Sequence, residues 1–177
     1  MIFVWIALGV LVGLPVLVVV LGFFFPERYT GRTRVTFAKG VQEVWDALLD
    51  PRKHPMTGKM MRSIRDEPDE NGLPVWVEDM GHGEEILVKT VESTPPARLV
   101  RTLSAKAVPM TSRWKYSLEG DAARTTVTVE GETFIRRGTW HVPIFRVMMV
   151  LGGGVKKGLD IQLRMIGRTL GVAAERG

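Results

Sequence analysis

A run of 24 residues without a charged side chain, Ile2–Phe25, divides this chain into two unlike parts. An α-helix rises about 1.5 Å per residue, so a helical run would extend roughly 36 Å, more than the hydrocarbon core of a bilayer. A removable signal peptide fits poorly, because it would need a basic start, a shorter apolar stretch and a small-residue cleavage site. The run instead ends in three phenylalanines and a proline. It therefore predicts a retained transmembrane anchor over residues 1–27.

The basic residues next to this run predict its orientation. No Lys or Arg precedes the run, whereas four follow it closely: Arg28, Arg32, Arg34 and Lys39. Basic residues beside a membrane span tend to remain on the cytoplasmic side. The pattern predicts a single-pass protein of the cell (inner) membrane, with its N-terminus outside and its C-terminal domain in the cytoplasm.

Residues 28–177 are enough for one domain with its own core. The chain has a formal net charge of +5 and no cysteine, which excludes disulfides and thiolate metal sites. Its basic residues are scattered rather than clustered, which argues against a nucleic-acid partner. With an anchor predicted, the bilayer is the simpler partner for this positive charge.

Short segments of alternating polar and apolar residues fill the middle of the domain. One strand is predicted over 32–38, and a turn rich in Pro, Asp, Asn and Gly over 68–72. Five further strands are predicted after that turn: 75–80, 85–93, 98–105, 112–119 and 125–135. Short strands joined by turns predict a meandering antiparallel sheet.

Helical spacing appears on both sides of this strand region. Apolar residues from Val41 to Leu49 form one stripe, and Asp50-Pro51 ends the helix because proline disfavours helical geometry in the residue before it. A short second helix is expected over 54–64. Apolar residues recur every three or four positions from Phe145 to Leu170, which predicts one long amphipathic helix. The fold class is therefore α+β, with a helix lying across an antiparallel sheet.

Three consecutive glycines, Gly152 to Gly154, lie inside this predicted long helix. Each glycine in a helix interior costs about 0.5–1 kcal/mol relative to alanine. One explanation is a close crossing, where only a bare backbone clears the sheet or the helix after Asp50. The other is a hinge that lets residues 140–151 move as a lid. Close packing is the commoner reason for helix glycines, and both explanations remain open.

Two motifs carry a family resemblance. The first strand is followed by a helix with the pair Val44-Trp45, and the aromatic strand 112–119 is followed by a strand rich in Thr and Val. These motifs, in this order of elements, resemble the START/Bet v 1-like superfamily (SRPBCC; polyketide cyclase/dehydrase and lipid transport proteins). The resemblance covers residues 32–171. It implies a helix-grip fold, in which a curved antiparallel β-sheet wraps around a long C-terminal helix and leaves a cavity for an apolar ligand.

The resemblance also implies a function. We expect membrane-tethered binding, or transfer, of a lipid or other hydrophobic small molecule in the cavity between the sheet and the C-terminal helix. A cyclase/dehydratase-type enzyme acting on a hydrophobic substrate, and a membrane scaffold domain without a cavity, remain as alternatives. No catalytic pattern spans the superfamily, and the three histidines lack metal-ligand spacing, so we assign no catalytic residue, metal or cofactor.

Large apolar and aromatic side chains are the candidates for lining such a cavity. Thioether and aromatic groups suit adaptable apolar sites, although each of them also suits an ordinary core. The candidates are Trp76, Met80, Trp114, Tyr116, Phe134, Met148 and Met149.

Overall fold

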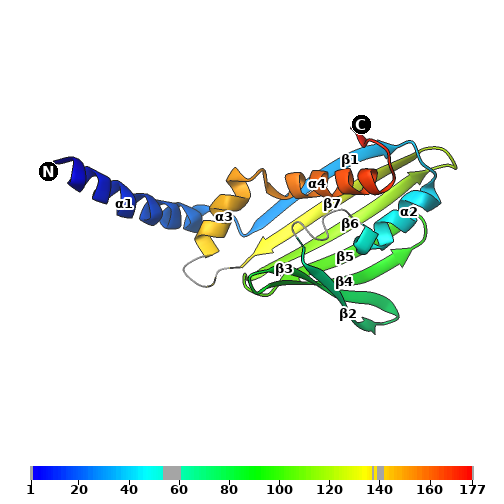
Figure 1. Cartoon of the computed structure of the whole chain (residues 1–177), viewed down its shortest axis with the longest axis horizontal. Helices are drawn as coiled ribbons and strands as arrows, with labels where there is room; N and C mark the ends of the chain where they lie inside the picture. The colour runs from blue at the N-terminus through cyan, green and yellow to red at the C-terminus, as the bar shows by residue number, and fades with distance from the viewer. Residues whose placement is uncertain (1, 54–60, 137, 139–141, 177) are drawn as a thin grey trace.

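The computed structural model describes residues 2–53, 61–136, 138 and 142–176. Its strands are β1 (Arg28–Phe37), β2 (Ser63–Glu70), β3 (Leu73–Gly81), β4 (Glu84–Thr94), β5 (Arg98–Ala105), β6 (Met110–Gly120), β7 (Thr125–Ile135) and β8 (Glu175–Arg176). Its helices are α1 (Ile2–Phe24), α2 (Val41–Leu49), the 3-10 turn η1 (Pro51–Lys53), α3 (Val142–Leu151) and α4 (Gly154–Thr169). The strands form one antiparallel sheet in the order β2-β3-β4-β5-β6-β7-β1-β8, with α2 and α4 packed on it (Figure 1).

The strands predicted from alternating residues are confirmed. The strands β3 to β7 form where the five segments after the turn were predicted, and β1 starts a few residues earlier than expected. Strand β2 was missed. Its sequence is mostly charged, and its side chains are largely exposed on the edge strand of the sheet, so no apolar alternation marks it. The predicted second helix partly overlaps β2, and its first part, residues 54–60, lies outside the described residues.

One face of the sheet carries the hydrophobic core. The side chains on this face, which we call the inner face, pack against α2 and α4 around residues such as Trp45, Tyr116 and Leu159. Gly31 and Gly131 lie opposite each other on β1 and β7. A Cβ atom at Gly31 would lie 2.6 Å from the backbone nitrogen of Lys156. The two glycines therefore let α4 lie directly on the sheet.

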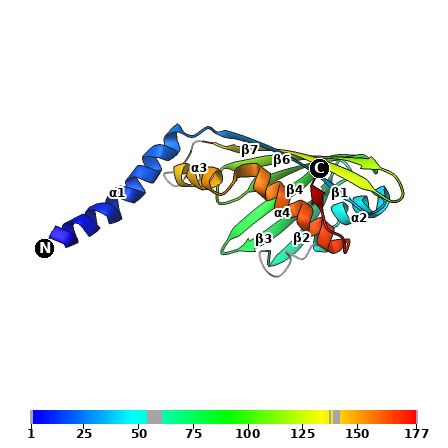
Figure 2. The same ribbon diagram turned by 90° about the horizontal axis from the view of Figure 1, so that it is seen from above.

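The helices cover the sheet unevenly. Helix α4 packs mainly on β1 and β7, and α2 packs on β6 and α4. The strands β2, β3 and β4 extend away from α4, as Figure 2 shows. The inner face of β3 to β5 is therefore less covered by the described helices than the half that β1, β6 and β7 form.

The predicted long C-terminal helix is two helices, α3 and α4, and the glycine run separates them. Gly153 and Gly154 have φ angles of +90° and +63°, in the left-handed region that favours glycine. The atoms nearest to a Cβ at Gly152, Gly153 and Gly154 belong to α3 and α4 themselves: Met148, Met149 and Lys157. The close-crossing explanation is therefore wrong, because the glycines allow one helix to end and the next to begin.

We expect Gly153→Ala to lower the free energy of unfolding by about 1–2 kcal/mol, because a residue with a Cβ atom is strained at positive φ. Urea unfolding of the variant and the parent protein measures this loss. Gly153→Asn is the matched control, since asparagine tolerates left-handed geometry better, and it should lose less. Equal losses of unfolding free energy in both variants would contradict the explanation that positive φ angles at the glycines separate α3 from α4.

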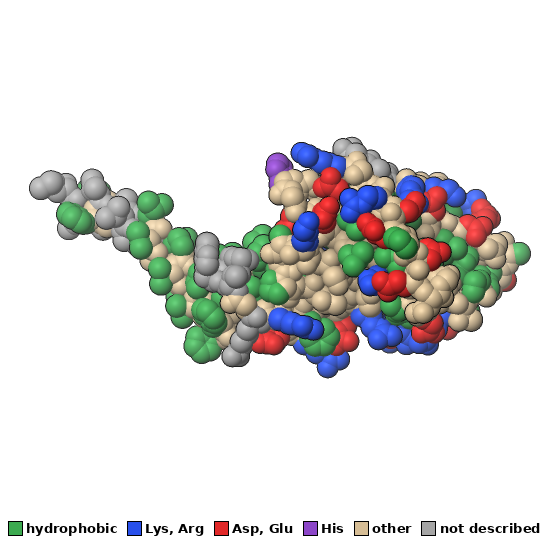
Figure 3. Space-filling model, turned by 90° about the horizontal axis from the view of Figure 1, so that it is seen from below, with side chains coloured by type: hydrophobic (Ala, Val, Ile, Leu, Met, Phe, Trp, Pro, Cys, Tyr) green, Lys and Arg blue, Asp and Glu red, His purple; other side chains and the backbone are tan. Residues whose placement is uncertain are grey.

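Helix α1 forms within the uncharged run, and hydrophobic side chains are exposed along it, whereas charges of both signs are interspersed on the body of the protein (Figure 3). The predicted membrane span is nevertheless not supported. Among the residues that the structure describes, no helix has the length and apolar character needed to cross a membrane. The predicted inner-membrane localisation, with the N-terminus outside and the domain in the cytoplasm, is corrected by this finding.

Arg146 of α3 joins α1 to the rest of the fold. Its buried guanidinium donates hydrogen bonds to the carbonyl oxygens of Phe25, at 3.3 Å, and Ile135, at 2.8 Å. It also forms an ion pair with Glu27 at 3.3 Å. Close by, Gly22 of α1 packs against Pro143 of α3. The end of α1, the start of β1, the end of β7 and helix α3 therefore meet at one side chain.

Candidate functional site

A buried arginine lies among apolar residues on the inner face. Arg101 is 3% exposed and alternates with Leu99 and Leu103 along β5. Its Nη1 and Nη2 atoms donate hydrogen bonds to the carbonyl oxygens of Leu48, at 3.1 Å, and Leu49, at 3.0 Å. These carbonyls belong to the last turn of α2, where they lack partners within the helix and where a positive charge is favourable. Arg101 therefore ties α2 to the sheet.

Strand β3 places an aromatic ring and a carboxyl group beside this guanidinium. The Cζ atom of Arg101 lies 4.7 Å from the ring centroid of Trp76, a cation–π distance. The indole Nε1 of Trp76 donates a hydrogen bond to Glu78 Oε1 at 3.0 Å. Burial raises the pKa of Glu78, and the Trp76 hydrogen bond and the charge of Arg101 partly oppose this rise. Trp76 thus lies between a cation and a carboxyl group.

Tyr116 links the same region to α4. It is fully buried, and its hydroxyl donates a hydrogen bond to Gln162 Oε1 at 2.7 Å. Burial raises the pKa of Tyr116, so the phenol remains neutral at physiological pH. We call Trp76, Glu78, Arg101 and Tyr116 the Arg101 cluster. It connects β3, β5 and β6 to both inner-face helices.

The cluster makes a pH-dependent contribution to stability. In the unfolded chain Glu78 ionises near its usual pKa of 4.5, whereas in the folded protein its pKa is higher. Between the two values the folded state binds more protons, so the contribution of Glu78 is greatest below 4.5 and declines as the pH rises through the folded pKa.

We therefore expect Glu78→Gln, which stays neutral, to gain stability relative to the parent protein as the pH is raised from about 4 to about 7. Urea unfolding of both proteins at several pH values measures the difference, in which the titration of all other groups largely cancels. A difference that does not change with pH would contradict the assignment.

The seven predicted cavity residues lie in several places. Three lie on the inner face: Trp76, Trp114 and Tyr116. Met80 lies at the register shift between Asp79 and Gly81 of β3, where it has no paired residue on β4. Phe134 points from the opposite, outer face of β7, is 41% exposed and has Arg28 over its ring at 5.7 Å. Met148 and Met149 lie on α3, and Met148 is 61% exposed. The structure thus brings Trp76, Trp114 and Tyr116 to one face and does not bring the other four to it.

The most informative residues of the cluster, Glu78 and Arg101, were missed from the sequence. The signal was present, because both are charged residues at positions whose neighbours two residues away are large and apolar. Glu78 alternates with Trp76 and Met80 in the same way that Arg101 alternates with leucines. A charged residue at a strand position whose side chain points into the core indicates a buried group with hydrogen-bond or ion-pair partners.

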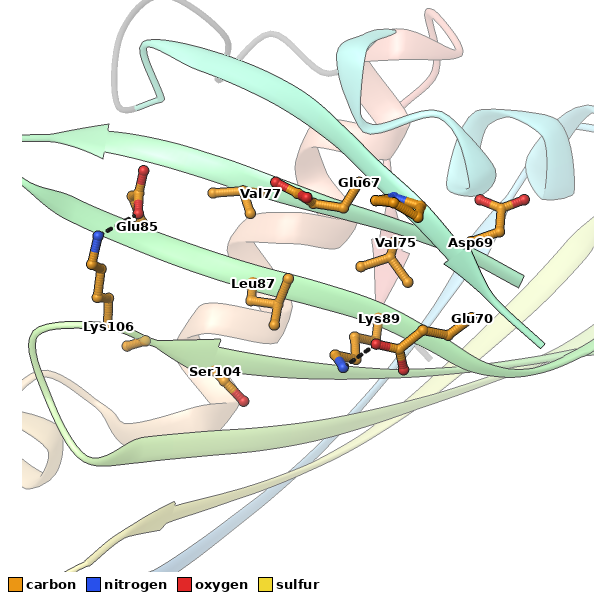
Figure 4. Close-up of a pocket in the computed structure, with 12 residues that line it drawn as sticks. Glu67, Asp69, Glu70, Val75, Val77, Glu85, Leu87, Lys89, Ser104 and Lys106 are labelled. Carbon is orange, nitrogen blue, oxygen red and sulfur yellow. Dashed lines mark hydrogen bonds and ion pairs between the residues drawn. The ribbon is translucent and has the colours of Figure 1, made fainter. Parts of the chain in front are cut away.

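A separate hollow of about 650 Å³ lies on the outer face of β2 to β5. In Figure 4 it has an apolar floor of two valines and a leucine between two ion pairs, Glu70–Lys89 and Glu85–Lys106, the latter at 2.9 Å. None of the seven predicted residues lines it. Because strand side chains alternate between faces, this hollow is on the opposite side of the sheet from the Arg101 cluster.

Metal chemistry has no support in the described part of the chain, where no three His, Cys, Asp or Glu side chains gather as a metal site would require. The inner face presents instead several hydrogen-bond donors, one carboxyl group and large apolar surfaces. Such an arrangement suits binding of a partly polar organic molecule.

No protein-family model matches the sequence, and no curated protein matches it. Solved structures do match. The Zhui aromatase/cyclase from Streptomyces sp. R1128 is 14% identical with a TM-score of 0.58, over 80% of this chain and 93% of that one. Norcoclaurine synthase from Thalictrum flavum is 8% identical with a TM-score of 0.59, over 81% and 93%. A START superfamily protein from Mycobacterium smegmatis is 13% identical with a TM-score of 0.55, over 80% and 94%.

This chain has the START/Bet v 1-like fold. The identities are low, so the likeness shows the fold alone, and it confirms the resemblance that the sequence motifs suggested. In the START/Bet v 1-like fold of this protein, the helix that crosses the sheet is α4, with α3 as a separate helix before it. The Arg101 cluster lies on the inner face of that fold.

Proposed function

We propose that the protein binds an apolar small molecule between the inner face of the sheet and α4. The observation that carries this proposal is a row of large apolar side chains that the described helices leave half-buried: Ile86, Leu103 and Trp114. They follow one another diagonally across β4, β5 and β6. A core that α4 sealed completely would bury such residues as fully as it buries Tyr116. Exposed apolar surface of this kind typically marks a binding site.

Proteins of the same fold support the proposal. One solved norcoclaurine synthase from Thalictrum flavum, with a TM-score of 0.58 and 8% identity over 85% of this chain and 90% of that one, is in complex with dopamine and hydroxybenzaldehyde. Both molecules are small and combine an apolar ring with polar oxygen atoms. A ligand of that general character would match the apolar row and the Arg101 cluster of this chain.

A second function, acid–base catalysis on a bound hydrophobic molecule, is favoured by one observation. Burial raises the pKa of Glu78, and a buried carboxyl group with a raised pKa is a typical proton donor and acceptor in enzymes. Loss of turnover in Glu78→Gln with unchanged ligand affinity would favour the enzyme. Binding without any turnover would favour a carrier.

The binding site is tested by filling it. Ile86 and Leu87 are neighbours on β4 whose side chains point to opposite faces, Leu87 being part of the outer hollow. We expect Ile86→Trp to weaken binding of the neutral dye Nile red to the full chain, because the larger ring occupies the inner face. Leu87→Trp is the matched control and should bind as the parent does.

The outcomes of this test are distinct. Both variants share the apolar surface of α1, so dye bound there is a common background. Weaker binding in Leu87→Trp alone would move the site to the outer hollow and overturn the proposal. Equal binding in all three proteins would favour the remaining alternative, a domain without an internal site. Mass spectrometry of gently purified protein would then identify any molecule that it carries.

A further inference from the structure

Three hydrogen-bonding side chains form a row across the inner face. Thr90 of β4 lies directly opposite Arg101 of β5, which lies directly opposite Trp114 of β6. Directly opposite residues have Cβ atoms about 4.5–5.5 Å apart, so the three side chains are neighbours. Thr90 is 4% exposed, and Trp114 packs against the core.

One polar atom of each residue is buried and has no hydrogen-bond partner in the part of the chain that the structure describes. These atoms are Thr90 Oγ1, Arg101 Nε and Trp114 Nε1. Buried polar groups in native proteins are nearly always satisfied, because an unpaired one loses its bonds to water without replacing them. Three such atoms side by side offer hydrogen bonds that the described part of the chain does not use.

The chemistry of the three atoms limits what that partner is. Arginine Nε and tryptophan Nε1 are donors only, and a threonine hydroxyl donates or accepts. The partner must therefore present an acceptor to at least two N–H groups. A carboxylate has two oxygens with about four acceptor positions, and its bonds to a guanidinium are charge-assisted. An ammonium group does not suit this position, because it would face two hydrogen-bond donors and the positive charge of Arg101.

We propose that the ligand of the inner face is an apolar molecule whose polar end is an acceptor oxygen, a carboxylate above all, held by Thr90, Arg101 and Trp114. This inference rests on the proposed function and adds the chemistry of the ligand's polar end. The other two nitrogens of Arg101 are committed to α2, so the guanidinium is oriented before the ligand arrives.

Glu78 is an acidic group close to Arg101, and its charge affects how an anion binds there. Its carboxyl accepts a hydrogen bond from the Nε1 of Trp76, whose ring also has Arg101 over it. Because burial raises its pKa, Glu78 takes up a proton more readily than an exposed glutamate when a second negative charge approaches. The row is therefore able to accept a carboxylate.

The test compares head groups on one tail. Calorimetric titration of the full chain with decanoate, decanol and decyltrimethylammonium should give an affinity at least about tenfold higher for decanoate than for decanol. The ammonium compound should bind most weakly. Equal affinities for the three compounds would overturn the inference and leave the proposed function standing. If none of them binds, the proposed function itself fails.

Conservative variants test whether Thr90 and Trp114 cause the preference for decanoate. Thr90→Val and Trp114→Phe keep the shapes of the side chains but remove the hydroxyl and the N–H group. Each should weaken decanoate binding by about tenfold and decanol binding by clearly less, because the uncharged alcohol oxygen is the weaker acceptor. Thr102→Val, on the outer face of the same strand as Arg101, is the matched control and should change neither. Unchanged decanoate binding in both inner-face variants would overturn the assignment. Should either variant fail to fold, the head-group comparison on the parent protein still decides.

Discussion

Replacing Arg101 by methionine should lower the free energy of unfolding by about 3–5 kcal/mol, because it breaks a buried, hydrogen-bonded charge site. The carbonyl oxygens of Leu48 and Leu49 lose their donor, and Glu78 loses the nearby cation. Methionine fills similar space, so the loss reports polar contacts more than a cavity. Urea denaturation monitored by tryptophan fluorescence measures it.

Arg98→Met, three positions earlier on the same strand, is the matched control. Arg98 is exposed and pairs with Glu92 at 2.6 Å on the surface, so its replacement should cost no more than about 1 kcal/mol. Arg101→Lys should fall between the two, because an ammonium group does not reproduce the two-pronged contact with α2. A loss in Arg101→Met as small as that in Arg98→Met would show that the buried guanidinium does not hold α2 in place.

Replacing Gly31 by alanine should lower the free energy of unfolding by about 2–3 kcal/mol, because the added methyl group would overlap α4. Its Cβ would lie 2.6 Å from the backbone nitrogen and 3.0 Å from the Cα of Lys156. Backbone atoms of a helix cannot rotate away as a side-chain end can, so α4 must shift as a unit. Urea unfolding measures the loss, and tryptophan fluorescence of the native state reports any shift of α4 against the sheet.

Gly158→Ala provides the control within α4 itself. No atom lies within 4 Å of the added methyl group, so this substitution should raise the free energy of unfolding by about 0.5–1 kcal/mol through helix propensity. The two glycine replacements thus have opposite expected signs. If Gly31→Ala were also neutral or stabilising, α4 would not be held against β1 as closely as the structure places it.

The sequence predicted the elements in which the spacing of apolar residues matches the spacing of buried side chains. The strands β6 and β7 alternate buried and exposed residues because one face of each packs on the core, and this period is visible without any structure. Strand β2 is held by pairing with β3 rather than by an apolar face, so its charged sequence resembled a turn. The C-terminal apolar stripe continued across the glycines, but periodicity does not report the positive φ angles that divide it.

The candidate site was predicted only in part. Apolar strand residues such as Trp76 and Trp114 were expected at a cavity, and they do lie on the inner face. Phe134 also lies on a strand, but its side chain points to the outer face. Which face a residue of β7 points to depends on the register between β7 and its neighbours. The row of unsatisfied donors arises from three strands far apart in sequence, so only the pairing of those strands reveals it. The membrane span was inferred from apolar length, and the described helices do not bear it out.

The contacts of Arg146 have a consequence for the order in which the chain acquires its shape during synthesis. The carbonyl of Phe25, at the end of α1, is held by a residue 121 positions later, and β1 takes its partner from β7, whose residues also emerge late. Since α1 and β1 leave the ribosome before β7 and α3, they must wait for those later segments before they are fixed. During that interval β1 is an unpaired strand, and its alternating arginines at positions 28, 32 and 34 are the kind of charges that discourage premature pairing with other chains. The strand β1 thus becomes part of the sheet only after β7 has been made.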